Sequence, residues 1–233
     1  MLSTKVAADT TPSTRNYDDN VAVDTKKKVD RARGNITQRR CLIDNIWNAH
    51  VVDYAHVYEA DGKKDGLISK LERSWNVKSG TLNSNTRRNI FRLSAKLHRL
   101  FDEEKWLLLP ETKIVDQYYE HYREAGYADE FPVIKDLSFN YTLVAHPDMR
   151  QVAIHRRVEG VDINTPGAFK TFIYPFDTFP VIVSHVHPCF VICNSGQKLK
   201  DYDKIVAFRK GDTDQRKKRI ARIQSFSKRL DGW

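Results

Sequence analysis

Residues 89–102 of the chain read NIFRLSAKLHRLFD. The first five of these residues carry isoleucine, phenylalanine and leucine, a composition that predicts a short strand. Ser94 can then cap a helix that runs to about residue 105. The large apolar residues of that helix recur at i, i+3 and i+4, at Leu97, Leu100 and Phe101. The sequence therefore predicts a strand that leads directly into an amphipathic helix, with His98 one turn into the helix.

A second strand is predicted upstream, at residues 51–58, which read VVDYAHVY. Two Asp-Gly pairs at residues 61–66 then predict a loop. The resulting order is strand, loop, strand, helix, with His56 on the first strand and Asn89 at the opening of the second. A lone histidine on a strand is usually half-buried and hydrogen-bonded to a neighbour. The ordered set of His56, Asn89 and His98 is more informative, because its placement fits one mechanism.

These residues resemble the HNH endonuclease domain, through residues 89–102 together with the AHV of residues 55–57. The closest branch is the one common in fungal proteins of unknown role. In that branch an Arg-Cys-hydrophobic segment precedes the Ala-His strand, as residues 40–43, RCLI, do here. The SHVHP of residues 184–188 also resembles a recurring element of those proteins. The resemblance covers residues 39–110 well and the remainder loosely.

The resemblance implies a ββα unit around one divalent metal and hydrolysis of phosphodiester bonds. His56 would be the general base that activates water. Asn89 would orient the strand or its loop by hydrogen bonds to backbone near the base. His98 would bind the metal, which would stabilise the phosphate and the departing oxygen.

The sequence departs from the family in one place that matters for the metal. Many HNH proteins have an acidic residue or a histidine directly before the base, where this chain has Ala55. Asp53 lies two residues earlier on the same face of the strand, and Asp102 lies four residues after His98 on the same face of the helix. Asp53, His98 and Asp102 would suit Mg²⁺ or Mn²⁺ and would tolerate Zn²⁺. The alternatives are that Asp53 is an ordinary surface residue and that Asp102 pairs with a neighbouring cation.

Five cationic residues crowd around the second strand and the start of the helix. They are Arg87, Arg88, Arg92, Lys96 and Arg99. Beside a metal site they are expected to contact the phosphates that flank the scissile bond. The alternative is a solvated face, partly neutralised by nearby glutamates. Lys96 is a further departure, since related fungal sequences often have an acidic residue there.

The net charge of +9 on 233 residues is concentrated at the two ends. Residues 1–40 carry nine Lys/Arg against five Asp/Glu, residues 198–233 carry twelve against five, and the residues between sum to −2. Such a distribution is not typical of a uniformly basic nucleic-acid coat. No apolar run is long enough for a membrane helix and no signal-peptide core is present, so we expect an intracellular protein, nuclear or cytoplasmic. Three cysteines are too few for a disulfide scaffold.

Four regions are predicted along the chain. Residues 1–36 are expected to form a disordered or loosely ordered arm, and residues 37–110 an HNH-like nuclease domain. Residues 111–208 are expected to form a strand-rich accessory region on that core, and residues 209–233 a basic amphipathic tail. Within the accessory region, Cys189 to Cys193 can extend the last strand. Together with His185 and His187 these cysteines also have the residue types of a zinc site, although the spacing favours a packed strand.

The predicted fold is therefore α+β, with a ββα-metal HNH core and a mixed, strand-rich C-terminal extension. The predicted function is a metal-dependent HNH-type endonuclease that hydrolyses phosphodiester bonds, with DNA the favoured substrate over RNA. The main alternative is a catalytically inactive HNH-like protein that binds nucleic acid or a protein partner. A third is an interaction protein in which residues 111–233 act and the ββα unit is scaffold. Oligomeric state is not predicted.

Overall fold

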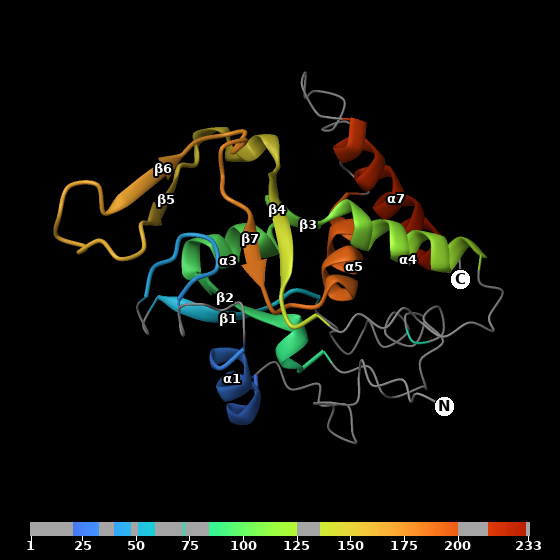
Figure 1. Cartoon of the computed structure of the whole chain (residues 1–233), viewed down its shortest axis with the longest axis horizontal. Helices are drawn as coiled ribbons and strands as arrows, with labels where there is room; N and C mark the ends of the chain where they lie inside the picture. Colours follow the sequence, from blue (N-terminus) through green and yellow to red (C-terminus); the bar gives the residue numbers. More distant parts are fainter. Residues whose placement is uncertain are drawn as a thin grey trace.

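The structure is a computed structural model that describes residues 21–32, 40–47, 51–58, 72, 84–124, 136–199 and 214–231 (Figure 1). Its helices and strands, in chain order, are α1 (Val23–Asp30), β1 (Val52–His56), η2 (Arg87–Asn89), β2 (Ile90–Ser94), α3 (Ala95–Asp102), β3 (Trp106–Pro110), α4 (Thr112–Glu124), β4 (Phe139–Ala145), η3 (Pro147–Gln151), β5 (Ile154–Arg157), β6 (Phe169–Phe172), β7 (Ile182–Ser184), α5 (Pro188–Lys198) and α7 (Asp214–Asp231). The predicted α+β class is confirmed.

The β1–β2–α3 unit forms as the sequence predicts. β1 and β2 pair antiparallel, with Asp53 opposite Leu93 and His56 opposite Ile90. α3 follows β2 directly and buries Leu97 and Phe101 in the core. Ser94 occupies the N-cap position of α3, but its hydroxyl donates to Asp44 Oδ2 (2.6 Å) instead of accepting a helix N–H. The cap residue therefore ties the helix start to the turn that precedes β1.

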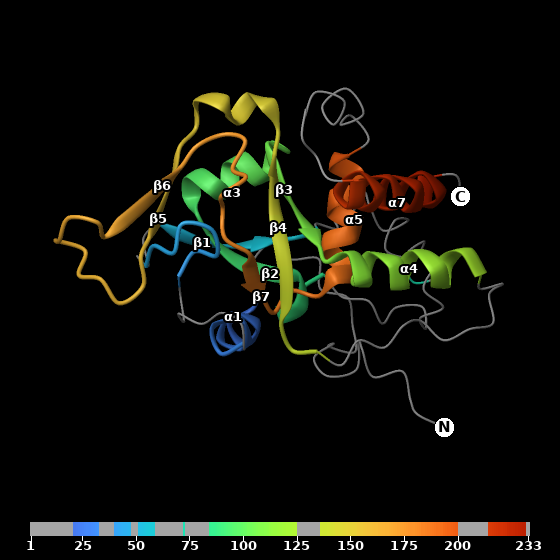
Figure 2. The same cartoon turned by 45° about the horizontal axis from the view of Figure 1, so that its top comes forward.

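The C-terminal extension is built on a three-stranded sheet with the order β3-β4-β7. All five residues of β3 are buried, which a continuous apolar run such as Trp106–Pro110 predicts for a strand covered on both faces. α5 packs on β3, and α7 packs on α4 and α5 (Figures 1 and 2). Lys198 of α5 is buried and donates to the carbonyl oxygen of Phe101 (2.6 Å) at the end of α3. The extension and the β1–β2–α3 unit therefore share one hydrophobic core.

The β5–β6 hairpin projects from the molecule beside the turn that precedes β1 (Figure 1). Arg156 donates to the carbonyl oxygens of Leu42 and Ile43, and the backbone N–H of Arg157 donates to Asp44 O (2.8 Å). These bonds anchor the base of the hairpin on the residues that lead into β1.

Helix α1 differs from the expectation of a disordered or loosely ordered arm over residues 1–36. Of that range, residues 21–32 are described, and α1 packs on the face of the β1–β2 hairpin opposite α3 (Figures 1 and 2). Val29 is fully buried in a small cluster with Val21 and Ile90. The remaining residues of the arm lie outside the described part of the chain.

The prediction that Cys189 to Cys193 extends a strand was wrong. β7 ends at Ser184, and α5 begins at Pro188 with His187 as its N-cap. Proline is favoured in the first turn of a helix because its missing N–H is not needed there. His187 Nδ1 accepts from the backbone N–H of Cys189 (3.4 Å) and lies 2.9 Å from the sulfur of the same residue. Among the described residues no group of three His, Cys, Asp or Glu side chains is placed to hold a metal, so this segment is a capped helix start.

His185 and His187 attach this segment to the back of the β1–β2–α3 unit. His185 Nε2 lies 3.0 Å from Ile90 O, and the backbone N–H of His187 donates to Arg88 O (2.8 Å). Both side chains are almost fully buried. Burial lowers the pKa of His185 to about 4 and that of His187 to about 3.

Within the described ranges, none of the helices has the length and apolar character needed to cross a membrane.

We expect acid to lower the free energy of unfolding through the buried side chains of His185 and His187. In the unfolded chain His187 is protonated below about pH 6.5, whereas in the folded protein it stays neutral down to about pH 3. The free energy of unfolding therefore decreases as the pH is lowered from about 6.5 to about 3. The loss amounts to about 1.4 kcal/mol per pH unit for each such group. His187→Asn retains a cap acceptor and should flatten the curve of unfolding free energy against pH. The exposed control His155→Asn should leave the curve unchanged; parallel curves for His187→Asn and wild type would contradict the expectation.

Candidate functional site

The two faces of β1 carry different parts of the predicted site. Asp53 and Ala55 point toward α3, whereas Tyr54 and His56 point to the opposite face, because side chains alternate along a strand. The burial agrees, since Ala55 lies in the main core and Tyr54 packs against the cluster around α1. Asp53 and His56 are separated along the strand by three residues, or about 10 Å. The five predicted catalytic and metal residues are therefore divided between two faces.

On the α3 face the structure brings together Asp53, His98 and Asp102. His98 Nδ1 lies 3.6 Å from Asp53 Oδ2, and His98 Nε2 lies 3.4 Å from Asp102 Oδ2. The imidazole is 25% exposed, and each carboxylate is 54% exposed. The helical spacing of four residues and the strand alternation place these groups as the sequence predicts.

The donor chemistry of this group suits a divalent cation, but its geometry limits how many ligands can act together. The two carboxylates face different nitrogens of one ring, and a single ion can bond to only one of those nitrogens. Accordingly, no three-ligand group is present among the described residues. Nε2 and Asp102 Oδ2 are far enough apart for one cation with bonds of about 2.0–2.2 Å to contact both. Asp53 then fits the role of the carboxylate that orients the ring through its other nitrogen.

On the opposite face His56 is held by a residue that the sequence analysis missed. His56 Nε2 lies 2.8 Å from Asn85 Oδ1, and Asn85 is buried. An amide oxygen only accepts hydrogen bonds, so in neutral His56 the proton sits on Nε2 and the lone pair on Nδ1. Asn85 lies in a polar loop without periodicity. Its spacing of four residues from Asn89 is the one sequence signal that could have drawn attention to it.

Asn89 is fully buried and links the backbone at Tyr58, just after β1, to the backbone at Ser84. Its Oδ1 accepts from Tyr58 N (3.0 Å), and its Nδ2 donates to Tyr58 O (2.8 Å) and Ser84 O (2.9 Å). Its backbone carbonyl also accepts from Val57 N (2.8 Å). These contacts hold backbone next to His56, although the residue lies at the end of η2 and not on β2 as predicted.

The five predicted phosphate-binding cations have different environments. Arg92 is 5% exposed, and its guanidinium pairs with Asp30 (3.0 Å), donates to Val52 O (3.3 Å) and lies over the ring of Tyr54. We therefore remove Arg92 from the phosphate contacts, because its charge is used inside the fold. Arg99 is exposed and pairs with Glu103 (2.9 Å), as the solvated-face alternative has it. Lys96 is exposed, and Arg87 and Arg88 are half-buried on η2.

Comparison with known proteins identifies the unit that carries these groups. Residues 41–108 match the family model described as HNH endonuclease. The matched range includes β1, β2, α3 and the first three residues of β3, and hence both faces of the candidate site. No curated protein and no solved structure matches the chain.

We predict that Asn89→Ala destabilises the protein by about 2–4 kcal/mol. The substitution leaves two carbonyl oxygens and one N–H without their partner, at a cost of about 1–3 kcal/mol for a buried group. Urea unfolding measures the change. The control is Asn140→Ala, since exposed Asn140 donates to Glu111 (2.8 Å) at the surface and its loss should cost less than about 1 kcal/mol. Equal effects of the two substitutions would contradict the role assigned to Asn89.

Proposed function

We propose that this protein, whose residues 41–108 match the HNH endonuclease family model, is an endonuclease that hydrolyses phosphodiester bonds, with DNA as the favoured substrate. The HNH endonuclease family implies a nuclease and a nucleic-acid substrate. The proposal that His56 is the general base rests on its hydrogen bond to Asn85. Because Nε2 of this half-exposed imidazole donates to Asn85 Oδ1, the lone pair that can accept a proton is on Nδ1.

In the proposed reaction, His56 Nδ1 takes a proton from the attacking water, and Nε2–H keeps its bond to Asn85 Oδ1. The water oxygen forms the new bond to phosphorus while the bond to the leaving oxygen breaks. Asn85 fixes the ring plane, so the base does not have to be ordered during the reaction. Asn89 holds the backbone at Tyr58, two residues after the base. Imidazole suits this task because its charge changes near neutral pH.

HNH nucleases generally use a divalent metal, and we propose Mg²⁺ or Mn²⁺, with Zn²⁺ tolerated, at His98 and Asp102. A bound cation would stabilise charge on the phosphate and leaving oxygen. Asp53 would orient His98. β1 pairs only with β2 in the described part of the chain, so a phosphate lying along its outer edge can face groups from both sides of the strand.

The inactive alternative rests on Ala55 and Lys96. Ala55 is fully buried, so the position before His56 contributes no ligand. Lys96 is exposed two residues before His98. An inactive domain would bind nucleic acid or a protein partner without cutting, and the two experiments below separate it from the enzyme.

We expect His56→Ala to lower the rate of plasmid cleavage by about 10²–10⁴-fold, because general-base catalysis contributes about that much. The assay uses supercoiled plasmid with Mg²⁺ or Mn²⁺ and measures nicked and linear product over time. His155→Ala changes an exposed histidine on the β5–β6 hairpin and should cut at the wild-type rate. Cleavage by His56→Ala at the rate of that control would show that His56 is not the base.

We expect Asp102→Asn to weaken Mn²⁺ binding by about 100-fold or more and Asp53→Asn by about 10-fold, because the first removes a ligand and the second an orienting group. Isothermal titration calorimetry with Mn²⁺ alone measures both. Asp148→Asn provides the control, since its equally exposed carboxylate pairs with Lys105. EDTA should stop cleavage. Wild-type Mn²⁺ affinity in Asp102→Asn, or cleavage in EDTA, would contradict the proposed cation site.

A further inference from the structure

We propose that the exposed lysines of α1 contact the backbone of the nucleic acid on the face of the β1–β2 hairpin that carries His56. The inference rests on the proposed function, since it names a substrate-binding surface for that site. It assigns a role to a helix that belongs to the basic N-terminal part of the chain and lies outside the family match.

Helix α1 is fixed on the hairpin by apolar and ionic contacts. Val29 is fully buried against Ile90 and Tyr54. Asp30 pairs with Arg92 (3.0 Å) and accepts from the hydroxyl of Tyr54 (3.1 Å). The charge of Asp30 is therefore neutralised within the fold, and the helix presents its other side to solvent.

The solvent side of α1 is basic. Lys27, Lys28 and Arg31 are exposed on it, and Lys26 lies partly buried over the ring of Tyr54. With Asp30 neutralised, Asp24 is the remaining acidic residue of the helix. Three exposed cations within five residues form a compact positive surface, which suits a polyanion with closely spaced charges.

Helix α1 is connected to the proposed base through a single residue, Asn85. Thr25 Oγ1 donates to the backbone carbonyl of Asn85 (3.3 Å), and the side chain of Asn85 holds His56. A phosphate group attacked beside His56 has neighbours along its strand at about 3.4 Å of helix rise per nucleotide. A backbone running from His56 across α1 would bring such phosphates to Lys27 and Lys28.

The α3 face is unsuited to the same task because it is acidic. Four exposed carboxylates lie on it or at its end: Asp53, Asp102, Glu103 and Glu104. Of the nearby cations, Arg99 pairs with Glu103 (2.9 Å) and Lys105 pairs with Asp148 (2.7 Å). The two faces of the hairpin thus differ in charge: carboxylates gather on the α3 face, and exposed lysines gather on α1.

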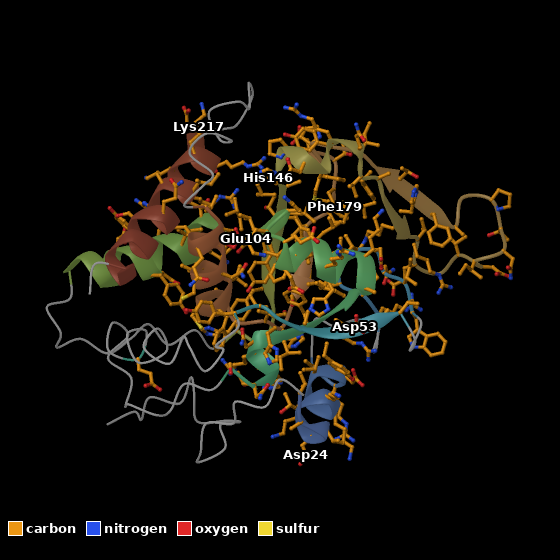
Figure 3. All side chains as sticks on the ribbon, turned by 180° about the vertical axis from the view of Figure 1, so that it is seen from behind. Asp24, Asp53, Glu104, His146, Phe179 and Lys217 are labelled. Atoms are coloured by element: carbon orange, nitrogen blue, oxygen red, sulfur yellow. The ribbon has the colours of Figure 1, made fainter. Side chains whose placement is uncertain are left out.

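The basic helix α7 provides a contrast at the other end of the molecule. Figure 3 shows Lys217 of α7 far from Asp24 of α1. Arg222 of α7 pairs with Asp116 of α4, and Arg219 donates to Pro110 O at the end of β3 (3.0 Å), so part of the charge of α7 is used in packing. Lys217 and Lys218 remain exposed and consecutive on a helix, as Lys27 and Lys28 are on α1. The two lysine pairs therefore form a matched comparison.

The experiment compares Lys27→Gln/Lys28→Gln with Lys217→Gln/Lys218→Gln in the full chain. Both carry His56→Ala so that the DNA is not cut, and fluorescence anisotropy measures binding of a linear mixed-sequence duplex from 50 to 300 mM KCl. We expect the α1 pair to raise Kd about 10-fold or more at low salt and to lower the slope of log K against log [KCl] by about 1–2. The α7 pair should change Kd less than about twofold. Circular dichroism and thermal melting check that both variants fold.

Equal effects of the two pairs, a larger effect of the α7 pair, or no DNA binding by the His56→Ala parent would overturn the inference. Failure of the proposed function has a different signature. If wild type does not cut plasmid but Lys27→Gln/Lys28→Gln still selectively weakens binding, the binding surface on α1 is supported and the nuclease assignment is wrong. If wild type cuts and Lys27→Gln/Lys28→Gln binds DNA with normal affinity, the nuclease assignment is supported and the proposed binding surface on α1 is wrong.

Discussion

The candidate site depends on the hydrogen bonds of one buried amide, that of Asn89. Three bonds from this side chain join the backbone just after β1 to the backbone just before η2. These bonds therefore help to fix where His56 and Asn85 meet. Because Asn89 is followed directly by β2 and α3, the same anchor also sets the position of His98 relative to the hairpin. An amide can make this junction because it both donates and accepts; an aliphatic side chain of similar size would make none of these three bonds.

The second organising feature is the difference between the two faces of β1. Strand alternation sends Asp53 toward α3, where carboxylates gather, and His56 toward α1, where lysines gather. A two-stranded hairpin is only marginally stable alone. Here it is covered by α3 and the C-terminal core on one side and by α1 on the other, and Arg92 links strand to helix through Asp30. The C-terminal extension contributes to the site indirectly, since His185 and His187 bond the carbonyl oxygens of Ile90 and Arg88.

Sequence reasoning succeeded where periodicity was local. The four-residue spacing of His98 and Asp102 and the strand position of Asp53 were enough to predict that the three side chains meet. The family resemblance located the ββα unit, which the family match at residues 41–108 confirms. The roles of His56, Asn89 and the metal ligands remain predictions.

Sequence reasoning failed where a residue's environment came from distant parts of the chain. Arg92 has the same charge as its neighbours, and only the packing of α1 shows that its charge is paired inside the fold. Asn85 lies in an irregular polar loop, where its four-residue spacing from Asn89 is too weak a signal to separate it from the asparagines around it. The segment after His187 reads as a strand by composition, but Pro188 and the capping histidine start a helix there. These features depend on tertiary contacts that local propensity does not contain.

The central claim is that the imidazole of His56 acts as a base in phosphodiester hydrolysis. Chemical rescue tests it most directly, by adding imidazole to His56→Gly during plasmid cleavage, beside His98→Gly as the comparison. If His56 is the base, His56→Gly cuts slowly without imidazole and its rate rises with imidazole concentration, whereas His98→Gly is not rescued. A His56→Gly rate equal to wild type without imidazole, or no rise at any imidazole concentration while wild type cuts, would contradict the claim.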